Sequence, residues 1–265
     1  MPAMAKGRFA AAVAFVGVAT TATTGCGDGA GAQTSISADP GSLAFVIDKG
    51  AAEQSQSQPL TIHFVGDGVV AGYAPGVMAP DWLSIEDAAL ATIDSASFIL
   101  TAAAAFMRDG AQVTYSLGSH DSVSMRFATG RLPANGDIRQ ATEIVYVDVP
   151  VMFSVVGFQA LPASVSLVGQ FNGATPPPTV FSSFQLDGSL PAPAPGAPFT
   201  PLAWTATSDQ PWLTLMPSSG ATPAIVYLTA DTAGFSAGEY QATITVTGGD
   251  LIPLKVPVTL TLTAP

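Results

Sequence analysis

The residues best suited to acid–base or metal chemistry in this chain are its two histidines, His63 and His120. His63 lies in an alternating stretch, residues 60–64, which would place it on the polar face of a strand. His120 stands between Ser119 and Asp121 in a turn, so the three residue types of a serine triad are adjacent in the sequence. A triad brings these groups together from separate elements, and a zinc site needs three or four converging ligands. The histidines therefore predict neither a catalytic centre nor a metal centre.

Carboxylates offer a second route to chemistry. Asp81, Glu86 and Asp87 flank Trp82, an arrangement that superficially resembles a sugar subsite. Glycoside hydrolysis needs two carboxyl groups about 5–10 Å apart in a cleft. A sandwich of this size seldom builds such a cleft, so we interpret these residues as an acidic surface loop.

Calcium is the remaining metal to consider. Asp67 in a Gly-Asp-Gly turn and Asp137 after an Asn-Gly pair could each supply a ligand. A calcium site takes roughly six to eight oxygen ligands, and no Asp-rich run supplies them. We expect no cofactor and no metal, and we expect that the chain is not an enzyme.

Aromatic residues carry the one plausible binding signal, because sugars stack on exposed aromatic faces. A β-sandwich also needs a buried tryptophan at its centre, and we assign Trp82, Trp204 and Trp212 to cores, with Tyr73 in a similar position. The remaining candidates for an exposed stacking platform are Tyr115, Phe181, Phe184 and Phe235. None of these stands out from the sequence, so the ligand-binding residues stay unknown.

Composition excludes one class of partner. Charged residues make up 10% of the 265 residues, and the formal net charge is −11. Nucleic-acid binding relies on a basic stripe that displaces counterions, and the sequence has no such stripe. The surface must instead be largely neutral and rich in hydroxyl groups.

The N-terminal segment has the composition of an export signal. Lys6 and Arg8 precede an apolar run, residues 9–19, which is shorter than the roughly 20 residues of a membrane span. Small residues follow up to Cys26, the single cysteine of the chain. The sequence predicts a signal peptide over residues 1–25 and a flexible Gly/Ala tether over residues 26–33.

The Thr-Thr-Gly-Cys stretch that ends at Cys26 resembles the bacterial lipobox, in which the chain is cleaved before a lipidated cysteine. This resemblance implies lipidation of Cys26 and an exported, membrane-anchored lipoprotein of the bacterial cell envelope. The alternative is an ordinary signal peptide with an incidental cysteine near its cleavage site.

An internal repeat organises the rest of the chain. Each half opens with a similar phrase, at residues 38–45 and 160–167, and contains a central Trp-Leu step, at Trp82 and at Trp212. An aromatic residue precedes each step by eight or nine positions, and an alternating strand closes each half. Four landmarks in the same order indicate two copies of one module.

The periodicity within the repeat is that of β-strands. Residues 240–247 alternate apolar side chains with threonine, and short apolar runs recur between Gly-rich turns. Pro150 and Pro257 lie inside the closing strands, where a proline should mark an edge strand or a switch between sheets. We predict an all-β chain with two tandem immunoglobulin-like β-sandwich domains, at residues 34–156 and 157–265, after the signal peptide and tether.

The phrases of the second half, from Trp204 through Trp212 and residues 217–220 to the strands at 237–246 and 256–262, closely resemble the BACON domain. This domain is a bacterial immunoglobulin-like module often found beside glycan-degrading domains. Residues 34–156 share the opening phrase, the Trp-Leu step and the closing strand.

The resemblance implies a non-catalytic module that binds carbohydrate or mucin. The alternative is a structural spacer or protein-interaction module without glycan binding. The expected partners are carbohydrate or envelope proteins, with membrane contact only through the N-terminal lipid and no contact with nucleic acid.

Overall fold

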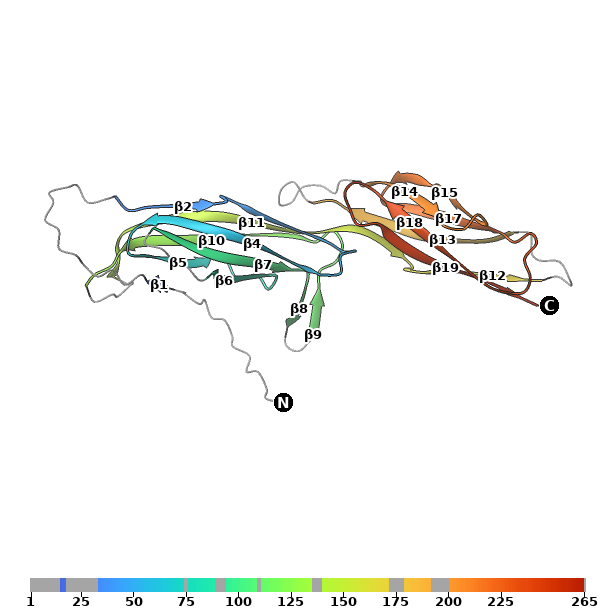
Figure 1. Cartoon of the computed structure of the whole chain (residues 1–265), viewed down its shortest axis with the longest axis horizontal. Coiled ribbons are helices and arrows are strands. Elements are labelled where there is room, and N and C mark those ends of the chain that lie inside the picture. Colours follow the sequence, from blue (N-terminus) through green and yellow to red (C-terminus); the bar gives the residue numbers. More distant parts are fainter. Residues whose placement is uncertain are drawn as a thin grey trace, which may run out of the picture. The chain divides into compact units, whose positions relative to one another are not determined.

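The computed structural model describes residues 33–73, 76–88, 94–108, 111–134, 140–171, 179–191 and 201–264, together with the backbone of a short strand at residues 15–17. The described residues form β-strands joined by turns, as Figure 1 shows. Among them, the structure holds no helix with the length and apolar character needed to span a bilayer. The prediction of an all-β chain is confirmed.

The chain divides into two compact units. The first comprises residues 1–45, 55–113 and 121–153, and the second comprises residues 46–54, 114–120 and 154–265. All residues after Phe153 belong to the second unit. Two earlier segments, residues 46–54 and 114–120, belong to it as well. Strands β3 (Leu43–Asp48) and β11 (Thr142–Leu161) contribute residues to both units.

The first unit is a β-sandwich. One sheet has the order β2-β4-β7-β6, and the other contains β5, β10, β11 and β3, with the short β1 paired to β5. The two remaining strands, β8 and β9, form a ribbon. The bounds are β1 (Phe15–Gly17), β2 (Ser35–Asp39), β4 (Ser55–Val65), β5 (Gly68–Tyr73), β6 (Leu83–Ala88), β7 (Ser95–Ala103), β8 (Ala105–Arg108), β9 (Ala111–Thr114) and β10 (His120–Arg131).

Alternating apolar side chains from the two sheets meet in the core of this unit, as expected for half-buried strands. Phe98 of β7 contacts Phe127 of β10 with ring centroids 5.2 Å apart. Trp82, next to β6, stacks on Phe153 of β11 at 5.0 Å. Both pairs connect one sheet to the other, so aromatic contacts hold the layers together.

The second unit repeats this plan. One sheet has the order β12-β19-β18-β14-β16, and the other consists of β11, β13, β17 and β15. Leu167, Phe184, Leu228, Ile244 and Leu260 are among the residues buried between them. The bounds are β12 (Val165–Gln170), β13 (Thr179–Ser189), β14 (Ala203–Ser208), β15 (Leu213–Met216), β16 (Ser219–Ala221), β17 (Ala224–Asp231), β18 (Gly238–Thr247) and β19 (Leu254–Thr263).

The two Trp-Leu steps have the same backbone hydrogen bonds. The amide of Leu83 donates to the carbonyl of Pro80 at 3.4 Å, and the amide of Leu213 donates to that of Gln210 at 3.3 Å. The Trp82 carbonyl accepts from the Ala103 amide, and the Trp212 carbonyl accepts from the Asp231 amide, each at 2.8 Å. By these matching bonds, β4, β7 and β6 of the first unit correspond to β13, β17 and β15 of the second.

Pro257 was predicted to mark an edge strand or a switch, but β19 lies inside its sheet, between β12 and β18. The parallel ladder with β12 begins at Val258, so at Pro257 β19 pairs with β18 on one side only. The strand tolerates the missing amide because no β12 residue pairs at that position. Pro150 lies three residues before β11 passes from the first unit to the second.

Candidate binding face

Trp82 lies in the core of the first unit, with 1% of its surface exposed. Its indole Nε1–H donates a 2.8 Å hydrogen bond to Oδ2 of Asp121, which satisfies the polar edge of the ring. Asp121 also accepts a bond from the backbone amide of Ser122. The acidic member of the Ser119-His120-Asp121 run therefore anchors a core tryptophan.

The two tryptophans of the second unit differ in burial. Trp204 on β14 is buried, and its Nε1 is without a hydrogen-bond partner. Trp212 is half-buried against the core and meets Phe235 edge-on at 6.2 Å. Phe235 in turn stacks on Tyr240 at 4.3 Å. These rings pack on one another, so Phe235 contributes to packing and not to an open platform.

The histidines are placed on separate units. His63 is exposed on β4, where its strand neighbours are Ser37 and Ser95. The Nδ1 atom of His120 lies 3.3 Å from the carbonyl oxygen of Gly118, two residues earlier. Among the described residues, no group of three or more His, Cys, Asp or Glu side chains could hold a metal ion.

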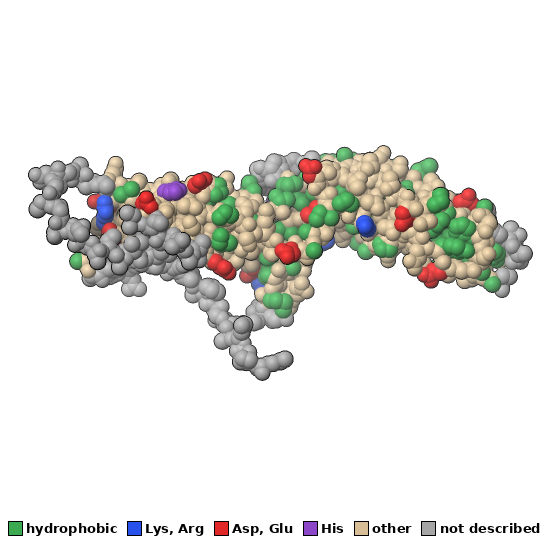
Figure 2. Space-filling model, viewed as in Figure 1, with side chains coloured by type: hydrophobic (Ala, Val, Ile, Leu, Met, Phe, Trp, Pro, Cys, Tyr) green, Lys and Arg blue, Asp and Glu red, His purple; other side chains and the backbone are tan. Residues whose placement is uncertain are grey.

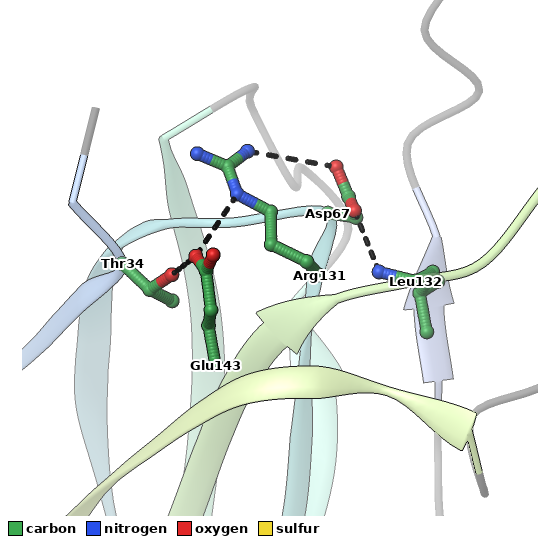
Figure 3. A network of polar contacts seen from close by, with 5 residues as sticks. All are labelled: Thr34, Asp67, Arg131, Leu132 and Glu143. Carbon is green, nitrogen blue, oxygen red and sulfur yellow. Dashed lines mark hydrogen bonds and ion pairs between the residues drawn. The ribbon is translucent and has the colours of Figure 1, made fainter. Parts of the chain in front are cut away.

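Asp67 belongs to a polar network at one end of the first unit, which Figure 3 shows. Its Oδ2 accepts a 2.7 Å bond from the Leu132 amide, and its Oδ1 lies 4.0 Å from Arg131. Arg131 also pairs with Glu143, which accepts a 2.8 Å bond from the Thr34 hydroxyl. Both carboxylates thus already have donors from the protein. The network joins β10, β11 and the turn after β4.

The other carboxylates near Trp82 are at the surface. Asp81 pairs with Arg108 of β8, and Glu86 is exposed on β6. The side chain of Asp87, together with Asp137 and Cys26, lies outside the described residues. Tyr73 is half-buried, and burial raises the pKa of its phenol. Within the described part of the chain, Asp81 and Glu86 belong to no group of three or more side chains that could hold a metal ion.

An apolar strip on the second unit is the feature best suited to bind a partner. It consists of Phe181 on β13, Tyr227 and Ile225 on β17, Met216 on β15 and Leu161 on β11, all exposed on the outer face of one sheet. Phe181 and Met216 are each 70% exposed, and Tyr227 is 58% exposed. Single exposed apolar residues are ordinary, whereas a contiguous group indicates an interaction surface.

The strand register makes the strip continuous. Tyr227 lies opposite Met216 on one side and opposite Ser183 on the other, while Phe181 lies opposite Thr229. Phe181 and Tyr227 are therefore diagonal neighbours on adjacent strands, within reach of one another. Ile225 and Leu161 both lie opposite Gln185, which extends the strip to β11.

Polar side chains separate the apolar ones. Ser183, Gln185 and Thr229 lie on the same face, and the Gln185 amide donates to both carboxylate oxygens of Asp187 at 3.0 Å. These hydroxyl and amide groups can donate and accept hydrogen bonds beside the rings. Figure 2 shows the wider context, with charged side chains scattered over a surface that is mostly uncharged.

The sequence identified part of this strip. Phe181 was a candidate for stacking and is exposed, whereas Phe184 was wrong because it is buried at 1%. Residues three apart in one strand point to opposite faces, so both could not be exposed. Tyr227 was missed because residues 225–228 are all apolar, and such a run does not show which side faces solvent.

The first unit also exposes an aromatic side chain, Tyr146 on β11, but a cation covers it. The Arg126 guanidinium lies 5.2 Å from the Tyr146 ring centroid. Arg126 also forms two hydrogen bonds with Asp148, at 2.7 and 2.6 Å. These hydrogen bonds lower the pKa of the Asp148 carboxyl and raise that of Arg126.

Residues 190–263 match the model of the viral BACON domain. No functionally curated protein matches the chain.

Similar solved structures include the D00-D0 domain of Intimin (11% identity, 85% of this chain and 98% of that one, TM-score 0.41). They also include DIP-gamma IG1+IG2 (10% identity, 87% and 97%, TM-score 0.36). A third is a Bacteroides ovatus GH5 xyloglucanase in complex with a XXXG heptasaccharide (15% identity, TM-score 0.30), where the match covers 40% of this chain and 19% of that one. Residues 190–263, which match the viral BACON domain, lie within the second unit.

Proposed function

We propose that this chain is a non-catalytic adhesion or interaction module whose second unit binds glycan through the apolar strip. The observation that carries the proposal is the exposure of Phe181 and Tyr227 as diagonal neighbours on a regular sheet face. The match to the BACON domain supports the same assignment, because it covers β15 and β17, two of the strands that form the strip.

The chemistry of the strip suits a sugar. The apolar C–H face of a pyranose stacks on an aromatic ring, and the hydroxyl groups at its edge seek hydrogen-bond partners. Phe181 and Tyr227 supply the rings, while Ser183, Gln185 and Thr229 supply donors and acceptors. Because these side chains come from paired strands, the sheet holds them in fixed positions before the ligand arrives.

A glycan array tests this proposal, using the chain with Cys26→Ser so that it stays free of lipid. We expect the Cys26→Ser chain with an intact strip to bind specific glycans on the array. The double variant Phe181→Ala/Tyr227→Ala should lose this binding. The matched control is Ile99→Ala, which changes the position in the first unit that corresponds to Tyr227. Lack of binding to any glycan would contradict the proposal. The alternative would then be a protein partner, which Met216 and Ile225 could also contact.

The proposed non-catalytic role is supported by the contacts that the candidate carboxylates and histidines make. Asp121 is bonded to Trp82, and Asp67 is bonded to Leu132 and paired with Arg131. His63 and His120 belong to different units. These contacts support structural roles for the carboxylates that the sequence brought forward.

We further propose that residues 1–25 are removed on export and that Cys26 carries the lipid that holds the chain at the bacterial envelope. The sequence pattern up to Cys26 supports this. In cells, Cys26→Ser should move the chain from the membrane fraction to the soluble fraction and abolish labelling by a radioactive fatty acid. Unchanged labelling of the variant would contradict lipidation at Cys26.

A further inference from the structure

The charged side chains on the outer face of the strands that form the apolar strip have one sign. The strip's four strand segments carry two charged side chains on their outer face, Asp187 on β13 and Asp231 on β17. Asp187 lies one outward position beyond Gln185, and Asp231 lies one outward position beyond Thr229. Asp231 therefore lies beside Phe181, and Asp187 lies at the other end of the strip, beyond Ile225 and Leu161.

Cations are rare in this part of the chain. From Ser154 to Pro265 the sequence contains one lysine, Lys255, and no arginine, against five acidic residues. Lys255 lies on β19, in the other sheet of the second unit. The remaining described cation of this unit is Lys49, in the loop after β3. Neither lysine lies on a strand that forms the strip.

From these charges we infer that the strip takes neutral glycan chains and rejects acidic ones such as uronate-containing or sialylated glycans. This inference rests on the proposed glycan-binding function and narrows it. Carboxylate recognition in proteins uses Arg or Lys in direct contact with the anion, and the strip offers none. Asp231 would repel an acidic sugar placed over the rings, and Asp187 would repel one placed over the Ile225 and Leu161 end of the strip.

The geometry also sets a minimum length for the ligand. Phe181 and Tyr227 lie on adjacent strands, and each ring can cover the face of one pyranose. A monosaccharide therefore engages one ring, whereas a chain of two or more sugars engages both. Affinity should increase from monosaccharide to disaccharide and then level off once the strip is covered.

The test compares polysaccharides that share a backbone and differ in charge. We would measure binding of the Cys26→Ser chain to hydroxyethylcellulose and carboxymethylcellulose, and to methyl-esterified and de-esterified polygalacturonate. Where a pair binds, its neutral member should bind roughly threefold to tenfold more tightly than its acidic member at low salt, as expected for a nearby like charge. Added salt should narrow this difference, since it screens exposed charges.

A second variant separates charge from shape. Asp187→Asn/Asp231→Asn keeps the size of both side chains and removes their charge, so it should raise affinity for the acidic members and leave the neutral ones unchanged. Tighter binding of an acidic member by the wild type, abolished by Phe181→Ala/Tyr227→Ala, would overturn this inference while keeping the glycan site. Absence of binding to all four polymers and to every glycan on the array would overturn both together.

Discussion

Two equivalent sheets of this protein have similar inner faces and different outer ones. They are β2-β4-β7-β6 in the first unit and β11-β13-β17-β15 in the second. The registers match position by position, so each strip residue has a counterpart in the first unit. The pairs are Phe181 and Ser57, Tyr227 and Ile99, Met216 and Glu86, Ile225 and Ser97, and Leu161 and Asp39.

The difference supports the proposed binding role of the second unit's outer face. Inward positions must stay apolar in both units because they fill a sandwich core, as Leu100 and Leu228 do at 0% exposure. Outward positions contribute little to the core and can change without loss of the fold. The first unit carries mostly serine, threonine and acidic residues there, whereas the second carries large apolar side chains. An exposed apolar group confined to one of two copies indicates a binding role and not a requirement of the fold.

The inner faces should respond alike to truncation. Leu100→Ala and Leu228→Ala each remove a fully buried side chain at the same position of the repeat. Each should lower the free energy of unfolding of its unit by roughly 2–5 kcal/mol, measured by chemical denaturation. If the free energy of unfolding falls by less than about 1 kcal/mol at either position, the two cores are not equivalent.

The Trp-Leu steps should respond unequally. Trp82→Phe removes a buried indole and leaves Asp121 without its 2.8 Å bond, which should cost the first unit roughly 1–3 kcal/mol. Trp212→Phe changes a half-buried ring packed edge-on against Phe235 and should cost less. Equal losses in denaturation of the two variants would show that the difference in burial has no energetic consequence.

Tyr146 offers a smaller test of the same comparison, because Arg126 covers this aromatic ring of the first unit. The Arg126 hydrogen bonds hold the pKa of Asp148 below its ordinary value. A lowered carboxyl pKa adds stability at neutral pH that is lost as pH falls through the folded-state pKa. Arg126→Gln should return the Asp148 pKa toward normal in an NMR titration and make stability less dependent on acid pH. An unchanged Asp148 titration would contradict the role of Arg126.

Much of the fold could be predicted from local pattern. Alternation with period two and the repeated Trp-Leu step identified two β-sandwiches, since both depend on nearby residues. The membership of the loop at residues 46–54 could not be predicted in this way. Asp48 bonds the Ile252 amide, 204 residues away, and Gly157 has φ +118° with Asp48 Oδ1 only 2.8 Å from the position of a Cβ. Such contacts exist only once the fold brings distant segments together.

The apolar strip was only partly predictable for a related reason. Phe181 is followed by two serines in the sequence, whereas Tyr227 and Ile225 alternate with the buried Val226 and Leu228. The sequence alone gives both sides of that strand the same apolar character. Only the pairing of β17 with β13 and β15 shows which side faces out and that Met216 joins it.

The most direct test exchanges the outer face of the second unit for that of the first. The variant Phe181→Ser/Tyr227→Ile/Met216→Glu/Ile225→Ser places the first unit's residues on the second unit's sheet, and calorimetric titration with a glycan that the wild type binds measures the result. We predict that affinity falls by at least roughly tenfold while the free energy of unfolding changes by less than about 1 kcal/mol. Undiminished affinity in the folded variant would contradict the claim that this face binds the ligand.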